Sequence, residues 1–181
     1  LPKKYAIFTY HPTTLEDSDL KRDLDAIFDT LLKSDIGVLF TYANADFGGK
    51  TINNSIEDFC KLDTNKYKVV KSLGQLRYLS AMKHANLLIG NTSSGIIEAA
   101  SFYKPVVNIG NRQLGRLRGI NVIDCTIQEL YQSITLALSN DFIIKCQNQQ
   151  NIYGVGNVSK HIVQKLIKQP LSVVKKFIDI K

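Results

Sequence analysis

The sequence predicts an α/β fold, a Rossmann-like three-layer domain in which helices cover both faces of a parallel sheet. Short apolar runs rich in β-prone residues alternate with longer amphipathic segments along the 181 residues. The links between them are short, as they are in right-handed βαβ units. Polar turns follow several of the apolar runs, and parallel sheets bind ligands beyond the carboxyl ends of their strands.

The first half of the chain predicts three strand–helix units. Each strand is a run of apolar, β-prone residues, and the segment after it has apolar residues near helical spacing. The predicted strands are 5–10, 36–42 and 67–70, and the predicted helices are 19–32, 52–62 and 75–84. Pro12 ends the first strand, because proline cannot donate to a strand ladder.

The second half predicts a similar succession of elements within the same single domain, residues 1–181. The predicted strands are 86–89, 105–109 and 121–123, and the predicted helices are one through Glu98, 127–138 and 158–167. The tail after Pro170 is predicted to form a last strand or helix.

Composition narrows the class of protein. The net charge is +7, but the Lys and Arg residues are scattered singly and in pairs. This favours a small anionic substrate over a nucleic acid.

No apolar run approaches the ~20 residues of a membrane span. The cysteine count of 3 is odd and no Cys-x-x-Cys occurs, as expected for free thiols in a reducing cytoplasm. The first residue is Leu, so we expect a piece of a longer polypeptide.

A hydroxyl-rich turn follows the predicted strand 86–89. Thr92, Ser93, Ser94 and Gly95 lead into a helix that contains Glu98. The free N–H groups at the start of a helix, its dipole and the hydroxyls favour an anion. Glu98, about one turn later, can accept hydrogen bonds from two neighbouring hydroxyls. This combination suits a nucleotide diphosphate and its ribose, although an N-capped helix without a ligand has the same pattern.

Other polar residues follow predicted strands as well. His11, Asn44 and Leu73 come after the first three, so we expect them at the same edge as Ser93. His11 is either a proton donor or phosphate ligand, or a histidine that hydrogen-bonds its own loop.

The loop 108–116 is basic and contains glycine. Its Arg112 suits a diphosphate, because the guanidinium fork matches phosphate geometry. The alternative is a surface loop with solvated arginines. The glycine spacing matches neither a P-loop nor a dinucleotide fingerprint. We also see no metal-binding cluster, and we expect no obligatory cofactor.

Several motifs in order resemble the hydrolysing UDP-N-acetylglucosamine 2-epimerases. The runs Gly-Asn-Thr-Ser-Ser-Gly-Ile-Ile-Glu-Ala and Pro-Val-Val-Asn-Ile-Gly-Asn-Arg-Gln-Leu-Gly-Arg are the most specific. The matching segments are 9–14, 43–46, 90–99, 105–116, 121–123 and 152–157. The resemblance extends from His11 to about Leu166.

The resemblance implies a fold and a reaction. The family is similar to the GT-B glycosyltransferases, in which two Rossmann-like domains enclose the substrate, and this chain resembles the carboxyl-terminal, UDP-binding domain. Such enzymes eliminate UDP from UDP-N-acetylglucosamine and add water to the 2-acetamidoglucal intermediate. The products, N-acetylmannosamine and UDP, imply a role in sialic-acid-type sugar synthesis, often for bacterial capsule or surface polysaccharide.

The resemblance also implies roles for single residues. His11 is the implied catalytic residue, near the diphosphate and the reacting sugar. The residues implied to bind UDP are Asn44, Leu73, Thr92, Ser93, Ser94, Gly95, Glu98 and Arg112. The Leu73 backbone is implied at the uracil edge with Tyr78 nearby. Thr92 replaces the commoner serine and keeps the hydroxyl.

One part of the family's machinery is not found. The carboxylates for proton transfer at C2 belong to an amino-terminal domain that this sequence lacks, and Asp19, Asp46 and Glu57 are better explained as surface acids. We therefore expect the chain alone to be inactive, with the missing domain of the same polypeptide as its partner and a homodimer as a further possibility. The alternatives are an epimerase of UDP- or GDP-linked diacetylbacillosamine, a GT-B glycosyltransferase half, or a UDP-binding module without catalysis.

Overall fold

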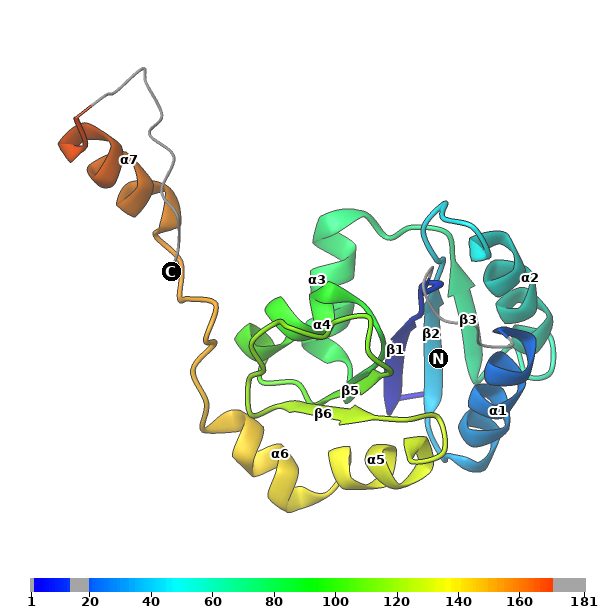
Figure 1. The fold of residues 1–181 in the computed structure, drawn as a ribbon. Helices are drawn as coiled ribbons and strands as arrows, with labels where there is room; N and C mark the ends of the chain where they lie inside the picture. Colours follow the sequence, from blue (N-terminus) through cyan, green and yellow to red (C-terminus); the bar gives the residue numbers. More distant parts are fainter. Residues whose placement is uncertain (1, 14–19, 171–181) are drawn as a thin grey trace.

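The computed structural model describes residues 2–13 and 20–170. Its centre is one parallel sheet (Figure 1). The strands are β1 (Tyr5–Thr9), β2 (Gly37–Thr41), β3 (Tyr67–Val70), β4 (Leu87–Gly90), β5 (Val106–Ile109) and β6 (Val122–Cys125), in the order β3-β2-β1-β4-β5-β6. Every adjacent pair is parallel. The predicted fold class is confirmed, and each strand overlaps its predicted segment.

The helices also follow the prediction, but the helices in the second half of the chain differ from it in number and in bounds. They are α1 (Leu20–Lys33), α2 (Gly49–Cys60), α3 (Gly74–His84), α4 (Ser93–Ile97), the 3₁₀ helix η1 (Ala99–Phe102), α5 (Leu130–Ala137), α6 (Asn140–Gln147) and α7 (Val158–Lys168). Helix α6 was not predicted. It buries only Phe142 and Cys146, so its apolar stripe is too narrow for a clear helical period. The predictions for Asp19 and for the tail after Pro170 lie outside the described residues.

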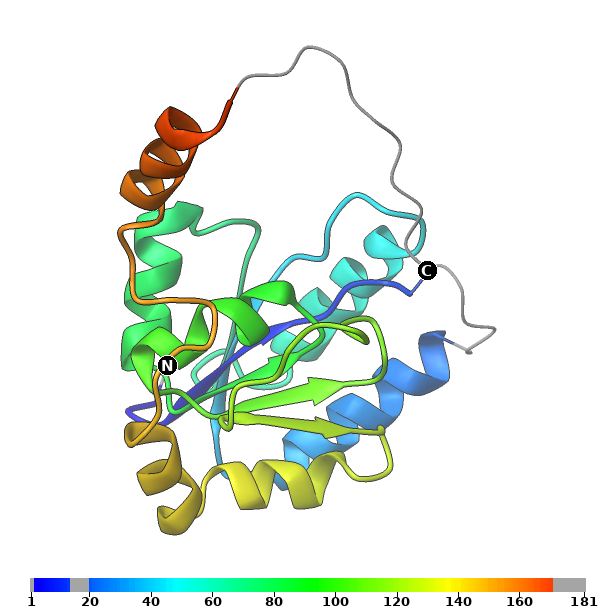
Figure 2. The ribbon, with the colours of Figure 1, turned by 60° about the vertical axis from the view of Figure 1, so that its left-hand side comes forward.

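Helices cover the two faces of the sheet unequally (Figure 2). Helices α1, α2 and α5 pack on one face and build the larger core. In α1 the buried residues Leu24, Ile27, Phe28 and Leu31 recur at helical spacing. The rings of Phe28 and Phe59 stack with centroids 4.5 Å apart. Helices α3 and η1 cover the other face through a smaller cluster around Met82.

Helix α7 lies apart from these layers. Figures 1 and 2 both show it at the end of an extended segment that leaves α6. It has no buried residue, and its apolar side chains are exposed. Its amphipathic pattern is therefore not explained by packing within the described residues.

Candidate functional site

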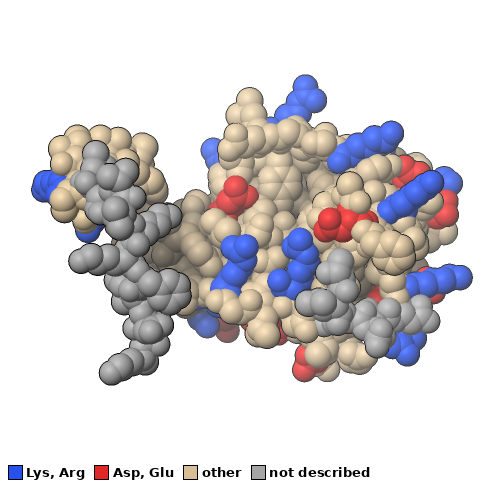
Figure 3. Space-filling model, turned by 45° about the horizontal axis from the view of Figure 1, so that its top comes forward, with Lys and Arg blue, Asp and Glu red and all other residues tan. Residues whose placement is uncertain are grey.

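The polar residues predicted to meet do lie along the carboxyl-terminal edge of the sheet. The strand order changes direction between β1 and β4, whose ends Thr9 and Gly90 are in register. Open α/β sheets bind ligands at such a switch point. Figure 3 views this edge, where Lys, Arg, Asp and Glu side chains surround a hollow.

The hollow, about 460 Å³ in volume, lies between the turn after β4 and the start of α3. The residues lining it include Thr9, Leu73, Tyr78, Thr92, Ser94 and Glu98. Most of these were predicted to bind a nucleotide. Hydroxyls and one carboxylate thus converge on a space that a small polar ligand can enter.

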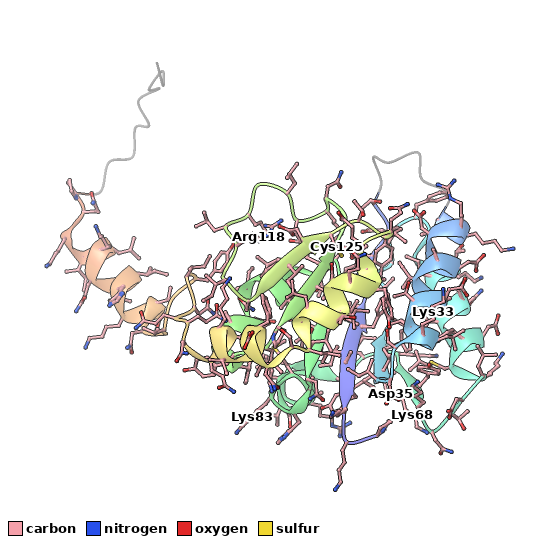
Figure 4. All side chains as sticks on the ribbon, turned by 90° about the horizontal axis from the view of Figure 1, so that it is seen from below. Lys33, Asp35, Lys68, Lys83, Arg118 and Cys125 are labelled. Atoms are coloured by element: carbon pink, nitrogen blue, oxygen red, sulfur yellow. The ribbon has the colours of Figure 1, made fainter. Side chains whose placement is uncertain are left out.

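Another hollow, of about 660 Å³, lies at the opposite edge, between Lys4, Asp35 and Asp63. Figure 4 looks at that edge, where Lys33, Asp35 and Lys83 are labelled. None of the predicted site residues lies there. The amino-terminal edge of the sheet therefore does not contain the predicted chemistry.

The turn after β4 is organised by its own side chains. The Thr92 hydroxyl caps α4 by accepting the Ser94 N–H at 3.3 Å. The Ser94 hydroxyl donates to a Glu98 carboxylate oxygen at 2.5 Å. Gly95 is buried, and a Cβ there would lie 3.0 Å from Val106 Cγ1, so Gly95 allows close packing on β5. The turn holds Glu98 beside the hollow, and a carboxylate with about four acceptor sites can still take further donors.

The helix after this turn is shorter than predicted. Helix α4 has only 5 residues, and Glu98 is its C-cap, where the chain continues into η1. The expected contribution of a helix dipole is therefore small, because few peptide units are aligned. An anion here would depend mainly on the local N–H groups, the hydroxyls and nearby cations.

Tyr78 was given only a minor place in the prediction, yet its side chain lines the hollow. Burial raises the pKa of the phenol, and the Glu98 carboxylate adds to the rise, whereas hydrogen bonds with Ser94 and Thr9 oppose it. Tyr78 therefore stays protonated and links α3 to the turn. The sequence contained a signal for this position, because Tyr78 lies 4 residues before Met82 and so shares the face of α3 that packs on the sheet.

His11 and Asn44 are brought together as predicted. The Asn44 backbone N–H donates to His11 Nδ1 at 3.1 Å, so Nδ1 is an acceptor and the ring proton is on Nε2. Burial lowers the pKa of His11, the Arg112 charge lowers it further, and the Asn44 side chain and the Asp46 charge oppose this. His11 is accordingly neutral at pH 7.

The three arginines of the loop after β5 differ in position. Arg112 is partly buried, and its Nη1 donates to the Asn91 carbonyl at 3.1 Å. Arg118 pairs with Asp124, with Nε 3.0 Å from Oδ2, and also donates to the Arg116 carbonyl. Arg116 is exposed. Arg112 is thus the arginine of this loop that is held beside the turn after β4.

Asn91 was not singled out from the sequence. It is 1% exposed, and its side-chain amide bonds both backbone groups of His11, at 2.7 Å to N and 2.8 Å to O. Gln113 Nε2 donates to the Asn91 carbonyl at 2.8 Å. The sequence did contain a signal for Asn91: it is a polar residue just after a buried strand, as His11 and Asn44 are.

Among residues 2–13 and 20–170, no group of His, Cys, Asp and Glu could hold a metal ion. The helices of this part of the chain are also too short or too polar to cross a membrane.

The chain was compared with known proteins. Residues 1–167 match the family described as UDP-N-acetylglucosamine 2-epimerase. The chain is 40% identical over 145 residues to the GDP/UDP-N,N'-diacetylbacillosamine 2-epimerase (hydrolyzing) of Campylobacter jejuni, covering 78% of this chain and 37% of that protein. It is 32% identical to the polysialic acid biosynthesis protein P7 of Escherichia coli, covering 99% and 47%.

Solved structures agree on the fold. The Neisseria meningitidis UDP-GlcNAc 2-epimerase bound to UDP-GlcNAc superposes with a TM-score of 0.72 at 18% identity, covering 92% of this chain and 45% of that one. Staphylococcus aureus MnaA with UDP gives 0.70 at 15% identity, covering 91% and 44%. The Escherichia coli heptosyltransferase WaaC gives 0.52 at 14% identity, covering 74% and 43%. The chain spans less than half the length of the relatives it matches.

Proposed function

The chain belongs to the UDP-N-acetylglucosamine 2-epimerase family. We propose that it is the carboxyl-terminal, UDP-binding half of a hydrolysing enzyme. The complete polypeptide would convert UDP-N-acetylglucosamine to UDP and N-acetylmannosamine for sialic-acid-type sugar synthesis. The observation that supports this best is the hollow at the switch point, where Thr92, Ser94 and Glu98 line one side. The family match over residues 1–167 also supports it, as does the polysialic acid biosynthesis protein P7 of Escherichia coli, which matches 99% of the chain.

In this proposal the nucleotide lies along the carboxyl edge of β4. The turn N–H groups, the hydroxyls of Thr92 and Ser93, and Arg112 bind the diphosphate. Glu98 accepts hydrogen bonds from the ribose hydroxyls and also keeps its hydrogen bond from the Ser94 hydroxyl. The uracil edge meets the Leu73 backbone beside Tyr78.

His11 would act at the leaving group. Its neutral ring has the proton on Nε2, because Nδ1 accepts the Asn44 N–H. It can donate a hydrogen bond from Nε2 to a diphosphate oxygen, which stabilises the negative charge that develops as the C1–O bond breaks and UDP departs with the electron pair. The negative charge of the bound diphosphate also raises the pKa of His11 and so favours the imidazolium, which can transfer its Nε2 proton to the departing UDP.

The remaining proton transfers need other groups. Elimination removes the C2 proton, and water then adds across the C1–C2 double bond, with a new proton at C2 from the opposite face. Within the described residues, Asp46 is the acid whose charge acts on His11, and its carboxylate already accepts a hydrogen bond from the Asn44 side chain. We therefore assign the C2 acid and base to the other half of the polypeptide, and we expect the chain alone to bind UDP without turnover.

A second sugar is favoured by a specific comparison. The relative named as a diacetylbacillosamine epimerase is 40% identical, whereas the Neisseria meningitidis UDP-N-acetylglucosamine 2-epimerase is 28% identical. A 2,4-diacetamido sugar on the same nucleotide would use the same diphosphate and ribose contacts. The two substrates would differ in contacts with the sugar, part of which we assign to the other half.

An isotope experiment on the complete polypeptide tests the reaction. UDP-N-acetylglucosamine and UDP-diacetylbacillosamine are supplied in H₂¹⁸O and in D₂O. A hydrolysing epimerase puts ¹⁸O on C1 of the free 2-epimeric sugar and one deuterium on C2, and leaves UDP unlabelled. Release of UDP only when a sugar acceptor is added would instead identify a glycosyltransferase. A product that keeps its UDP would identify a non-hydrolysing epimerase, and either result would overturn the proposal.

A further inference from the structure

Asn91 occupies the junction between the three segments that form the site. It follows β4, it is 1% exposed, and its backbone N–H donates to the Thr9 carbonyl at 3.1 Å. The side chain therefore has no freedom to face solvent. Its position between the ends of β1 and β4 is the switch point of the sheet.

The Asn91 side chain fixes the backbone of His11. Its Oδ1 accepts the His11 N–H at 2.7 Å, and its Nδ2 donates to the His11 carbonyl at 2.8 Å. An amide is the side-chain group that can do both at once, because it has an acceptor and donors in one plane. Loss of the amide would leave two partly buried backbone groups without these partners.

The backbone carbonyl of Asn91 holds the loop that contains Arg112 in place. It accepts Arg112 Nη1 at 3.1 Å and Gln113 Nε2 at 2.8 Å. Gln113 is 3% exposed, so its hydrogen bond to Asn91 anchors the buried side of the loop, whereas Arg112 is only partly buried. His11 and Arg112, which come from opposite sides of the switch point, are thus held by one residue.

We propose that Asn91 is a positioning residue of the nucleotide site, which sets His11 and Arg112 on the two sides of the turn 92–94. The proposal deepens the proposed function and rests on it for the identity of the ligand. Asn91 itself is not a catalytic residue, because its polar side-chain atoms are bonded to His11 and not directed to the hollow. Its effect on the ligand is exerted through the other two residues.

The His11 ring reports on this arrangement. With its backbone fixed, His11 can keep Nδ1 in line with the Asn44 N–H. The charged groups that face it are Arg112 and Asp46. If the backbone is released, we expect the Nδ1 bond to be lost, both neutral tautomers to be populated, and the pKa of His11 to rise toward 6.5 as burial decreases.

The test compares Asn91→Ala with Asn121→Ala in the chain described here. Asn121 is also fully buried, and its Nδ2 donates to the Lys104 carbonyl at 2.9 Å, but it lies before β6 at the opposite edge. It controls for loss of a buried asparagine. The measurements are UDP affinity by calorimetry and the ring nitrogen shifts of His11 by NMR, with His84 and His161 as internal references.

For Asn91→Ala we expect roughly tenfold weaker UDP binding, about 1.4 kcal/mol, together with mixed His11 tautomers. Asn121→Ala should leave both readouts unchanged. The proposal is overturned if a folded Asn91→Ala chain keeps its affinity within twofold and its His11 tautomer, or if Asn121→Ala changes them equally.

A second variant covers the case in which Asn91→Ala does not fold. Asn91→Asp has the same shape and still accepts the His11 N–H, but at neutral pH it cannot donate to the His11 carbonyl. We expect it to shift the His11 tautomers, and an unchanged ring would overturn the proposal. If the unaltered chain does not bind UDP, the proposed function fails, while the His11 ring still tests the role of Asn91.

Discussion

Arg112 is the residue whose assigned role depends most on charge. Its guanidinium is held beside the turn after β4 by the Asn91 carbonyl. We expect Arg112→Ala to weaken UDP binding by ~1.5–3 kcal/mol, the usual contribution of hydrogen bonds to charged groups. Calorimetric titration measures this. Arg116→Ala is the matched control, because Arg116 is exposed on the same loop and should leave the affinity unchanged. Equal losses would mean that the loop contributes only net charge.

Glu98 can be tested by removing part of the ligand instead of part of the protein. It is assigned to the ribose, so Glu98→Ala should weaken UDP by ~1.5–3 kcal/mol and inorganic pyrophosphate much less. Glu129→Ala serves as the control, because Glu129 accepts hydrogen bonds from Thr126 and does not line the hollow. If UDP and pyrophosphate lose the same affinity, Glu98 only supports the turn through Ser94.

The pKa of His11 predicts a pH dependence of stability. Burial and then Arg112 lower it below 6.5. Below pH 6.5 the unfolded chain therefore binds a proton that the folded chain resists, and the free energy of unfolding falls as the pH decreases toward the folded pKa. Urea denaturation between pH 5 and pH 8 should show a steeper acid loss for the unaltered chain than for His11→Asn. Parallel curves would contradict the lowered pKa.

At the scale of elements, the close approach of β1 and β4 depends on Gly90. Its φ is +131°, and a Cβ would lie 1.9 Å from the Thr9 carbonyl oxygen. Gly90→Ala should therefore cost at least ~3 kcal/mol of unfolding free energy. Gly115→Ala is the control, since φ is +83° but no atom lies within 4 Å, and it should cost only ~1–2 kcal/mol. Similar losses in urea denaturation would mean that strain, and not the clash, decides.

The elements that the sequence predicted best are those whose pattern is set by burial on the sheet. The buried strands β1 and β2 end within one residue of their predicted bounds, and α1 shows a full apolar stripe. Helix α6 escaped prediction because it buries little. The turn after β4 was predicted as a place, but the shortness of α4 was not, because local propensity does not tell where an α-helix continues as a 3₁₀ helix.

The site residues could be predicted where a polar side chain follows a strand in an α/β pattern. His11 and Asn44 were expected at one edge, and the structure joins them. Asn91 was missed because its side chain bonds the two backbone groups of a single residue, His11, which lies 80 positions away. Such contacts follow from the order of strands in the sheet, and a linear pattern does not contain that order.

At the scale of the whole molecule, one half-site and one unpacked helix stand out. The chain spans less than half the length of its relatives, and α7 exposes apolar residues such as Ile162 and Leu166. The described sheet nevertheless has its own core on both faces. We therefore expect the nucleotide contacts within this chain to form without a second domain.

Calorimetric titration of this chain with UDP decides whether it contains a nucleotide site, with GDP as the comparison and circular dichroism to confirm the fold. We expect saturable binding of one UDP per chain, weaker binding of GDP, and a strong loss for Glu98→Ala. A folded chain that binds neither nucleotide, or that binds UDP equally well with Glu98→Ala, would contradict the claim that the switch point between β1 and β4 is a nucleotide site.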